Sequence, residues 1–458
     1  MDKTICLLND SFPPLIDGVS NTIKNYARVL HEKGEDVMVI CPDNPDKDDS
    51  VFDYDILRYH SVDARNTTGF TLGMPFSPKI ADSLRKKDIG IMHCHCPATT
   101  LFLARSLRDT VVNAPLIMTY HTKYDVDIQK ILKLKSVPHS AVKVMVDNIS
   151  ACDEVWTVSK GAGDNLKSLG YKGDVYVMEN GVDMPLGRVS DDVIAKAVQG
   201  YDLPEGVPVF LFVGRQMWYK GVKIILDAME GLKSAGMNFR MVFIGTGLDA
   251  EAIRQYSTDA GLDDRCIFTG AVRDRELLRG WYARADLFLF PSTYDTNGLV
   301  VREAAASMLP TIMIKDSCAS EGVTDGVNGF LISESSASLA LKLYQLCQQP
   351  QLMKQVGEAA ARDIYMSWDD AVEKARQRYE VVMDNYARGY YPRHAKMTDE
   401  LLKSSGEVMK VLGYAQHVGK LPQAIKNRFS GKRTQAPEEY WPHHKVDDRV
   451  HDEETDGI

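Results

Sequence analysis

Short apolar runs alternate along the chain with segments whose apolar residues recur every three or four positions. Thr4–Leu8 is the first apolar run, and 36–41 is the next. Both predict strands that are buried on two faces of a parallel sheet. Between them an amphipathic stripe predicts a helix that is capped at Ser20 and ends at Gly34 (Val19, Ile23, Ala27, Leu30). A strand, a loop, a helix and a second strand make a Rossmann-like unit.

The same alternation continues along the chain and divides it in two. Apolar runs up to 155–159 extend the first sheet, and a new run at 209–213 begins a second one. The stretch between them is polar and contains Pro and Gly, which predicts a linker. We therefore expect an α/β protein made of two Rossmann-like domains and a linker (first domain 1–185, linker 186–207, second domain 208–366).

The composition agrees with a soluble protein of two domains. The chain has 458 residues, of which 44% are hydrophobic and 26% are charged, as in ordinary globular proteins. Its net charge of −9 argues against a general nucleic-acid binder. The amino terminus lacks the pattern of a signal peptide, and no apolar run is long enough to span a membrane. The eight scattered cysteines fit reduced thiols, so we expect a cytoplasmic location.

A strand, a tight turn and a helix late in the chain carry the most informative polar residues. Asp295 and Asn297-Gly298 lie in the turn, the helix opens at Leu299, and Glu303 lies in its first turns. Free N–H groups at a helix start favour a phosphate, and two separate carboxylates can accept hydrogen bonds from two hydroxyl groups. A sugar nucleotide offers a hexose, a diphosphate and a ribose to such a site. The alternative is an ordinary strand, turn and helix with a surface acid.

Two cations lie on the loop that follows the strand at 209–213. Arg215 can hold phosphate oxygens through two nitrogens, and Lys220, five positions later, supplies a point charge. Together they can neutralise a leaving diphosphate without Mg²⁺, so we expect no metal. Isolated cations on a loop are usually solvated, but the presence of Asp295 and Glu303 in the same domain favours a functional role.

Histidines at two strand ends are candidates for chemistry. His93 and His95 alternate with Cys94 and Cys96, which suggests a metal site. In a strand, however, the two histidines face one side and the two cysteines face the other, so the four cannot share one tetrahedral ion. His121 ends the next strand, where open α/β sheets place ligand contacts. A structural histidine at a strand end is the alternative there.

The motifs occur in the order found in the retaining glycosyltransferases of family 4, which have the two-domain GT-B fold. The matching motifs are spread over both domains (Asp17-Gly18-Val19, Asn180-Gly181-Val182-Asp183, Gly214-Arg215 with Lys220-Gly221, and Asp295 with Glu303). The last pair resembles the Glu-x7-Glu signature of the family, with Asp in the first position. The chain resembles this family over residues 1–388.

The resemblance implies a role for each candidate residue. It implies a catalytic set (His121, Asp295, Arg215, Lys220) and a donor-binding set (Gly18, Arg215, Lys220, Val272, Asp295, Asn297, Gly298, Leu299, Glu303). Arg215 and Lys220 would hold the diphosphate, and Glu303 would hold the ribose. Asp295 would contact the donor sugar, and His121 would lie beside its reacting carbon. The first domain would face the acceptor, the second would bind the donor, and a helix at 367–390 would cross back to the first domain.

The implied activity is the transfer of a hexose from a nucleotide diphosphate sugar, expected to be a UDP-sugar, to an acceptor hydroxyl. Neither a metal nor a cofactor is implied. The segment at 120–124 looks like that of bacterial glycosyltransferases that add hexoses to diacylglycerol. A membrane lipid is therefore the first expected acceptor, and the product would be a glycolipid. A soluble or polysaccharide acceptor stays open, as do a sugar-nucleotide epimerase of the same fold and a non-catalytic sensor.

Two basic segments suggest an anionic membrane surface as a partner. Between 130 and 146 the lysines alternate with apolar residues, which predicts either a membrane and acceptor contact or a solvated face (Lys130, Lys133, Lys135, Lys143). Residues 409–433 carry six cations on an apolar stripe, within an extension at 391–458 whose acidic end we expect to be disordered. We expect peripheral association with the inner face of the cell membrane, or else a segment that covers the protein's own surface. A chain that ends at Tyr391 is expected to fold.

Overall fold

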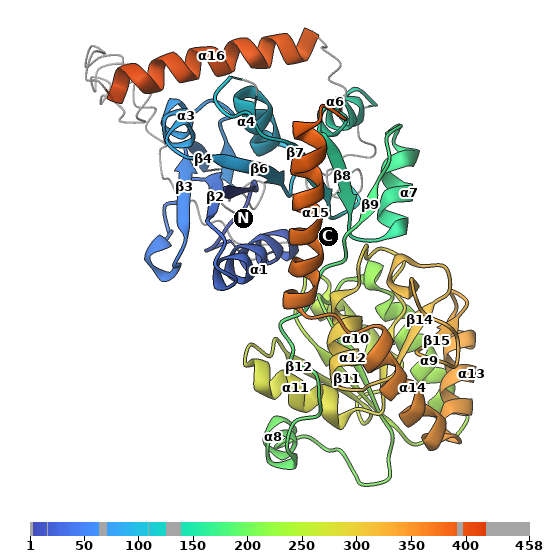
Figure 1. Ribbon diagram of the computed structural model, residues 1–458. Helices are drawn as coiled ribbons and strands as arrows, with labels where there is room; N and C mark the ends of the chain where they lie inside the picture. The colour runs from blue at the N-terminus through green and yellow to red at the C-terminus, as the bar shows by residue number, and fades with distance from the viewer. Residues whose placement is uncertain are drawn as a thin grey trace, which may run out of the picture.

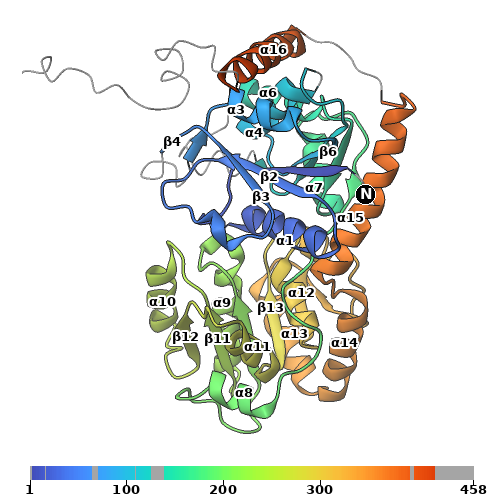
Figure 2. The same cartoon turned by 60° about the vertical axis from the view of Figure 1, so that its left-hand side comes forward.

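Two α/β domains lie one above the other, and a long helix leads from the second domain along the first (Figures 1 and 2). The computed structural model describes residues 3–15, 17–63, 71–108, 110–124, 139–391 and 397–417. The first domain contains a seven-stranded parallel sheet and the second a six-stranded parallel sheet. This is the predicted architecture of two Rossmann-like domains.

The first sheet has the order β3-β2-β1-β6-β7-β8-β9. All five residues of β1 are buried, because helices cover both faces of the sheet, and this burial explains the continuous apolar run. The strands are β1 (Thr4–Leu8), β2 (Val37–Pro42), β3 (Asp55–Tyr59), β6 (Ile89–Cys94), β7 (Leu116–Tyr120), β8 (Glu154–Thr157) and β9 (Tyr176–Val177). The helices are α1 (Gly18–Glu32), α3 (Pro78–Arg85), α4 (Thr99–Arg108), α6 (His139–Ile149) and α7 (Lys160–Ser168). A short antiparallel pair, β4 (Ser61–Asp63) and β5 (Thr71–Gly73), lies beside it.

The second sheet has the order β12-β11-β10-β13-β14-β15. Its strands are β10 (Val209–Val213), β11 (Arg240–Ile244), β12 (Cys266–Gly270), β13 (Leu287–Phe290), β14 (Thr311–Ile314) and β15 (Phe330–Ile332). Its helices are α8 (Asp191–Ala197), α9 (Val222–Ser234), α10 (Ala250–Asp259), α11 (Arg275–Arg284), α12 (Leu299–Ala306), α13 (Ser336–Cys347) and α14 (Pro350–Asp363). Both sheets reverse their strand order at the centre, between β1 and β6 and between β10 and β13. Ligands of open α/β sheets bind at the carboxyl ends of the strands beside such a reversal.

The helix α15 (Trp368–Ala387) follows the second domain and packs on the first, as predicted. Its buried face joins the apolar core formed by β1, β2 and α1 (Trp368, Ala371, Val372, Ala375, Tyr379, Val382). Tyr379 stacks on Trp156 with ring centroids 5.4 Å apart. The second domain is therefore connected to the first at both ends of its sequence.

A further helix, α16 (Met397–His417), covers α3 and α4. Met409 is fully buried, and its sulfur accepts a hydrogen bond from the Ser77 backbone N–H at 2.9 Å. Gly406 lies against α4 so closely that a Cβ there would be 1.8 Å from the Ser106 carbonyl oxygen. The beginning of the predicted basic segment is thus part of the first domain's packing, and 418–433 lie outside the described residues. None of the described helices is long and apolar enough to cross a membrane.

Two local predictions differ from the structure. Asp17, and not Ser20, caps α1: its carboxylate accepts hydrogen bonds from the backbone N–H groups of Val19 and Ser20, each at 2.8 Å. The Ser20 hydroxyl completes a capping box by accepting from the Asp17 N–H at 2.9 Å. The predicted linker contains α8, which packs on α11 where Gly280 lies beside Ala197. The segment belongs structurally to the second domain.

Candidate active site between the two domains

The turn between β13 and α12 contains the predicted strand-to-helix motif. Gly298 caps α12 with a φ of 59°, in the left-handed region that favours glycine. As a glycine, this cap residue contributes no side-chain hydrogen bond to the first N–H groups of the helix. A helix start of this kind can accept an anion through its N–H groups.

The loops after β10 and β13 touch each other through a glycine. Gly221 has a φ of 78°, and a Cβ at this position would lie 2.0 Å from the Pro291 carbonyl oxygen. Only glycine permits this approach. It places Lys220, the residue before it, next to the turn that contains Asp295.

Lys220 and Asp295 form an ion pair at this contact. The Lys220 ammonium lies 2.5 Å from Asp295 Oδ1, and Asp295 Oδ2 accepts a hydrogen bond from the Ser292 hydroxyl at 2.6 Å. Lys220 is only 8% exposed, and its ammonium lies 5.5 and 5.6 Å from the ring centroids of Tyr219 and Tyr294. The two rings touch each other, with centroids 4.7 Å apart, and lie on one side of the ammonium. Solvent therefore screens the pair less than it would at an open surface.

Arg215 and Glu303 lie on the same carboxyl edge of the second sheet. Arg215 follows β10 and is exposed. Glu303 lies within α12, and its carboxylate accepts hydrogen bonds from Arg275 and from the Tyr282 hydroxyl, each at 3.0 Å. Burial, and then the Glu303 charge, raise the pKa of Tyr282. Val272 lies just beyond the end of β12, half-buried, on this edge as well.

His121 brings the first domain to the same turn. Its backbone carbonyl accepts a hydrogen bond from the Thr296 hydroxyl at 2.6 Å. The Asn297 side-chain amide donates to the Val158 carbonyl at 2.7 Å. Burial lowers the pKa of His121 to about 3, so its imidazole is neutral at physiological pH. These hydrogen bonds place the ends of β7 and β8 directly opposite the β13–α12 turn.

A second contact joins the domains near the start of α7. The Glu321 carboxylate accepts hydrogen bonds from the backbone N–H groups of Lys160 at 2.7 Å and Gly161 at 2.5 Å. A carboxylate on the first N–H groups of a helix is a favourable electrostatic arrangement. No sequence motif pointed to three residues of this junction (Ser292, Thr296, Glu321). The contacts that they make depend on which loops meet in the folded protein.

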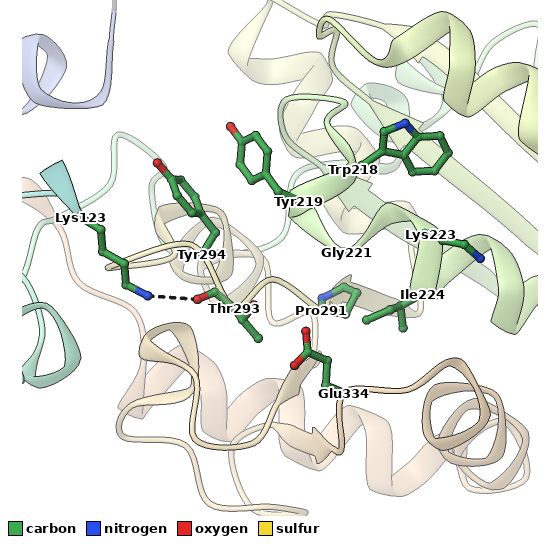
Figure 3. A pocket seen from close by; sticks show the side chains of 10 residues that line it. All are labelled: Lys123, Trp218, Tyr219, Gly221, Lys223, Ile224, Pro291, Thr293, Tyr294 and Glu334. Carbon is green, nitrogen blue, oxygen red and sulfur yellow. Dashed lines mark hydrogen bonds between the residues drawn. The ribbon is translucent and has the colours of Figure 1, made fainter. Parts of the chain in front are cut away.

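A pocket opens beside the ion pair (Figure 3). Its volume is about 460 Å³, and its walls combine aromatic, apolar and charged side chains (Trp218, Tyr219, Ile224, Pro291, Tyr294, Lys123, Lys223, Glu334). The Lys123 ammonium donates to the Thr293 carbonyl at 3.3 Å across the mouth, as the dashed line in Figure 3 marks. The size and the mixed lining suit a small polar ligand or part of a larger one.

The remaining candidates belong to the first domain. Gly18 is the first residue of α1, and this helix lies on the side of the first domain that faces the second (Figure 2). The space beside it is open, since a Cβ there would have no neighbour within 4 Å. Lys143 lies on α6 and pairs with Asp147 at 2.6 Å, while Lys130, Lys133 and Lys135 lie outside the described residues. Within the described part of the chain no group of three or more side chains could hold a metal ion.

Two protein-family models match the chain, one in each domain. The model described as Glycosyltransferase Family 4 matches residues 16–185. The model described as glycosyl transferases group 1 matches residues 194–363. The boundary between the two matches falls in the segment that joins the two sheets.

Characterised relatives match over most of the chain. A GDP-mannose-dependent alpha-mannosyltransferase of Corynebacterium glutamicum is 27% identical over 337 residues, which are 72% of this chain and 76% of the relative. An alpha-monoglucosyldiacylglycerol synthase of Acholeplasma laidlawii is 25% identical over 364 residues, which are 76% of this chain and 89% of the relative. The name of the first relative specifies mannose as its sugar, and the name of the second specifies a glucosylated diacylglycerol.

Solved structures share the arrangement of the two domains. Sucrose-phosphate synthase of Thermosynechococcus elongatus superposes with a TM-score of 0.67 at 18% identity, covering 83% of this chain and 99% of that one. The Anabaena protein Alr3699/HepE in complex with UDP and glucose superposes with a TM-score of 0.66 at 18% identity, covering 82% and 99%. Together with the family models and the two parallel sheets, these similarities show that the chain belongs to the family 4 glycosyltransferases and has the GT-B fold.

Proposed function

We propose that the protein is a retaining, metal-independent hexosyltransferase that moves a hexose from a UDP-sugar to the hydroxyl of a membrane lipid such as diacylglycerol. The observation that carries this proposal is the junction of Lys220, Asp295 and the start of α12 opposite His121. It combines a cation and free helix N–H groups for a diphosphate with polar side chains from both domains for a sugar.

In this proposal the second domain stabilises the leaving group. Arg215, Lys220 and the N–H groups at 297–299 neutralise the charge that develops on the diphosphate as its bond to the anomeric carbon breaks. The acceptor oxygen forms its new bond on the same face of the sugar, and its proton passes to a diphosphate oxygen. Glu303 binds the ribose, Val272 lies beside the base, and Asp295 contacts a hydroxyl of the donor sugar.

The first domain would complete the site. His121 faces the donor sugar as a neutral side chain, and the start of α1 at Gly18 leaves open space for the donor or the acceptor. We place the acceptor's polar head at the side of the junction where the pocket of Figure 3 opens. Its aromatic rings and two lysines suit a hydroxyl-bearing or anionic headgroup.

The choice of a lipid acceptor is supported by the relatives. Besides the Acholeplasma synthase, an alpha-monoglucosyldiacylglycerol synthase of Streptococcus pneumoniae is 23% identical over 317 residues. An enzyme that uses such an acceptor works at a membrane surface, so we place the protein in the cytoplasm, bound peripherally to the inner face of the cell membrane.

A direct assay tests the proposal. Purified protein is incubated with UDP-glucose, UDP-galactose or GDP-mannose and with vesicles that contain diacylglycerol, and the products are identified by mass spectrometry and by the NMR coupling of the anomeric proton. We expect a glycolipid with the donor's anomeric configuration, formed equally well in EDTA, and much more slowly by Lys220→Ala. Product formed only on soluble acceptors would overturn the lipid assignment. Inversion, or a loss of activity in EDTA that Mg²⁺ restores, would overturn the mechanism.

A further inference from the structure

Three buried histidines form a row from the core of the first domain to the junction. His93 and His95 are completely buried, with ring centroids 4.0 Å apart, and His121 at the end of the row is 6% exposed. His95 and His121 lie with their rings nearly parallel, at a centroid distance of 5.2 Å. Of the three, only His121 has a part in the proposed reaction.

The contact between His95 and His121 is a hydrogen bond. His95 Nδ1 lies 2.9 Å from His121 Nε2, so one of these nitrogens donates and the other accepts. Burial lowers the pKa of both rings, that of His95 to well below its usual range, so both are neutral and share a single proton along this contact. His121 Nε2 is therefore already occupied in the absence of substrate.

The rings that surround His95 on its other side are themselves held in place. His93 Nδ1 is hydrogen-bonded to the Tyr379 hydroxyl at 2.6 Å, and its Nε2 is hydrogen-bonded to the Thr119 hydroxyl at 2.7 Å. Tyr26 packs edge-on against His95, with a centroid distance of 5.2 Å. Within the described residues His95 Nε2 has no hydrogen-bond partner, so the bond to His121 is the polar contact that its imidazole makes. A buried imidazole left with one unpaired nitrogen costs free energy, so an unpaired group of this kind calls for an explanation, and the bond made by its other nitrogen offers one.

We propose that His95 is a positioning residue: by occupying Nε2 of His121 it fixes the plane and the tautomer of that ring, and it leaves Nδ1 as the nitrogen that His121 presents to the donor sugar. This inference rests on the proposed function, in which His121 faces that sugar. A ring held in one orientation and one tautomer keeps its polar atom where the transition state needs it, whereas a free ring must be ordered at each turnover.

The test compares two substitutions of nearly equal shape. His95→Asn keeps a polar atom near the position of Nδ1, and His95→Leu removes it. We expect His95→Leu to lower kcat by about 10- to 100-fold while the KM for the donor and the Kd for UDP stay within about twofold of the wild type, because the second domain holds the nucleotide. His95→Asn should recover most of kcat. Thermal unfolding and UDP calorimetry show that each variant is folded.

A second readout does not depend on the transferase reaction. In protein labelled with ¹⁵N-histidine, the ring nitrogens of His121, assigned through His121→Asn, report which nitrogen carries the proton. We expect one protonated and one bare nitrogen in the wild type, and averaged nitrogens in His95→Leu. A mixture of tautomers already in the wild type, or equal kcat in the Leu and Asn variants, would overturn the inference. If no donor were consumed but the tautomer responded to His95→Leu, the proposed reaction would fail while the positioning of His121 would stand.

Discussion

At the scale of single residues, Asp295 and Lys220 neutralise each other at the place where a diphosphate would bind. The ammonium is held 2.5 Å from the carboxylate and lies beside two tyrosine rings that touch each other. In the proposed function, an incoming diphosphate would compete with Asp295 for this cation. Asp295 would then be free to turn towards a sugar hydroxyl, which would link donor binding to the arrangement of the site.

Removing either cation should slow the reaction strongly. Lys220→Ala or Arg215→Ala is expected to lower kcat by about 100- to 1,000-fold, because each removes a charge that stabilises the leaving diphosphate. Lys233→Ala is the matched control, since Lys233 lies at the far end of α9 and pairs with Asp264 at 3.0 Å. Steady-state kinetics with a saturating donor measures the effect. Near-normal turnover in both variants would show that the donor binds elsewhere.

The two acids of the signature should differ in what they bind. Glu303→Gln is expected to weaken UDP binding, because a neutral amide accepts hydrogen bonds from a ribose less strongly than a carboxylate does. Asp295→Ala should lower turnover while UDP still binds, since it removes a competitor of the diphosphate for Lys220. Calorimetry with UDP alone separates the two effects. An equal loss of affinity in both variants would contradict this division.

The histidine row should make the folded state sensitive to mild acid. The pKa values of His93, His95 and His121 are lowered by burial, whereas in the unfolded chain they lie near 6.5. The unfolded chain therefore takes up protons that the folded protein does not, and the free energy of unfolding falls as the pH drops below 6.5. Urea denaturation between pH 7.5 and 5.5 should show a slope that approaches about 1.4 kcal/mol per pH unit for each histidine. His95→Asn should reduce that slope, and an unchanged slope would contradict the assignment.

At the scale of elements, strands were predictable and contacts between distant loops were not. A strand buried on both faces must be apolar at each position, so Thr4–Leu8 and 209–213 could be identified from their runs alone. The start of α1 was placed three residues too late, because Asp17 and Ser20 are both good caps and only the folded loop decides between them. The helix α8 was missed because it is short and most of its residues are exposed.

The site residues that belong to local motifs could be predicted from the sequence. Arg215, Lys220, Asp295 and Glu303 could be proposed because their chemistry and spacing are local. The pairing of Lys220 with Asp295 could not, since it depends on the approach of Gly221 to Pro291. The bond between His95 and His121 joins the ends of two neighbouring strands and likewise requires the sheet register.

The helix α16 changes the expected result of a truncation. A chain that ends at Tyr391 would expose α3 and α4 where Met409 and Gly406 now pack. Ending the chain there should lower the free energy of unfolding, and Met409→Ala alone should cost about 2–5 kcal/mol. Ending it at His417 should leave stability unchanged, and urea denaturation of the three variants makes the comparison.

The chain that ends at His417 also tests the basic segment without this damage. It lacks the cations after His417 but keeps α16. If these cations bind anionic membranes, the shortened chain should no longer co-sediment with anionic vesicles at low salt, whereas the full chain should. Unchanged co-sedimentation would assign membrane contact to another part of the protein. If ending the chain at Tyr391 left stability intact, the packing role of α16 would be wrong.

At the scale of the whole molecule, hydrogen bonds between loops hold the two domains together around the site. Thr296 bonds to His121, Asn297 bonds to Val158, and Glu321 bonds to the start of α7. Each donor or acceptor on the second domain lies within or close to the turn that contains the candidate donor site. Binding of a donor can therefore alter the junction between the domains directly.

Loss of the Glu321 contact should loosen this junction. In Glu321→Ala the first N–H groups of α7 lose a charged acceptor, and an exposed negative charge at a helix N-terminus contributes about 0.3–1 kcal/mol. We expect a larger radius of gyration by small-angle X-ray scattering and a lower kcat/KM. Glu358→Ala on the exposed side of α14 is the control. An identical scattering curve for Glu321→Ala would argue that the other contacts suffice.

The packing of α15 on the first domain has a consequence for synthesis. A ribosome makes the strands of the first sheet early, but their apolar face is covered by a helix that begins at Trp368, and Tyr379 lies 286 residues after its partner His93. At translation rates of ~5–20 residues per second, the nascent domain waits roughly 10 to 40 s for this helix after β8 has emerged. During that interval Trp156 and its neighbours lack their cover, which makes the nascent chain a client for chaperones. The domain that is translated first is the last one to be completed.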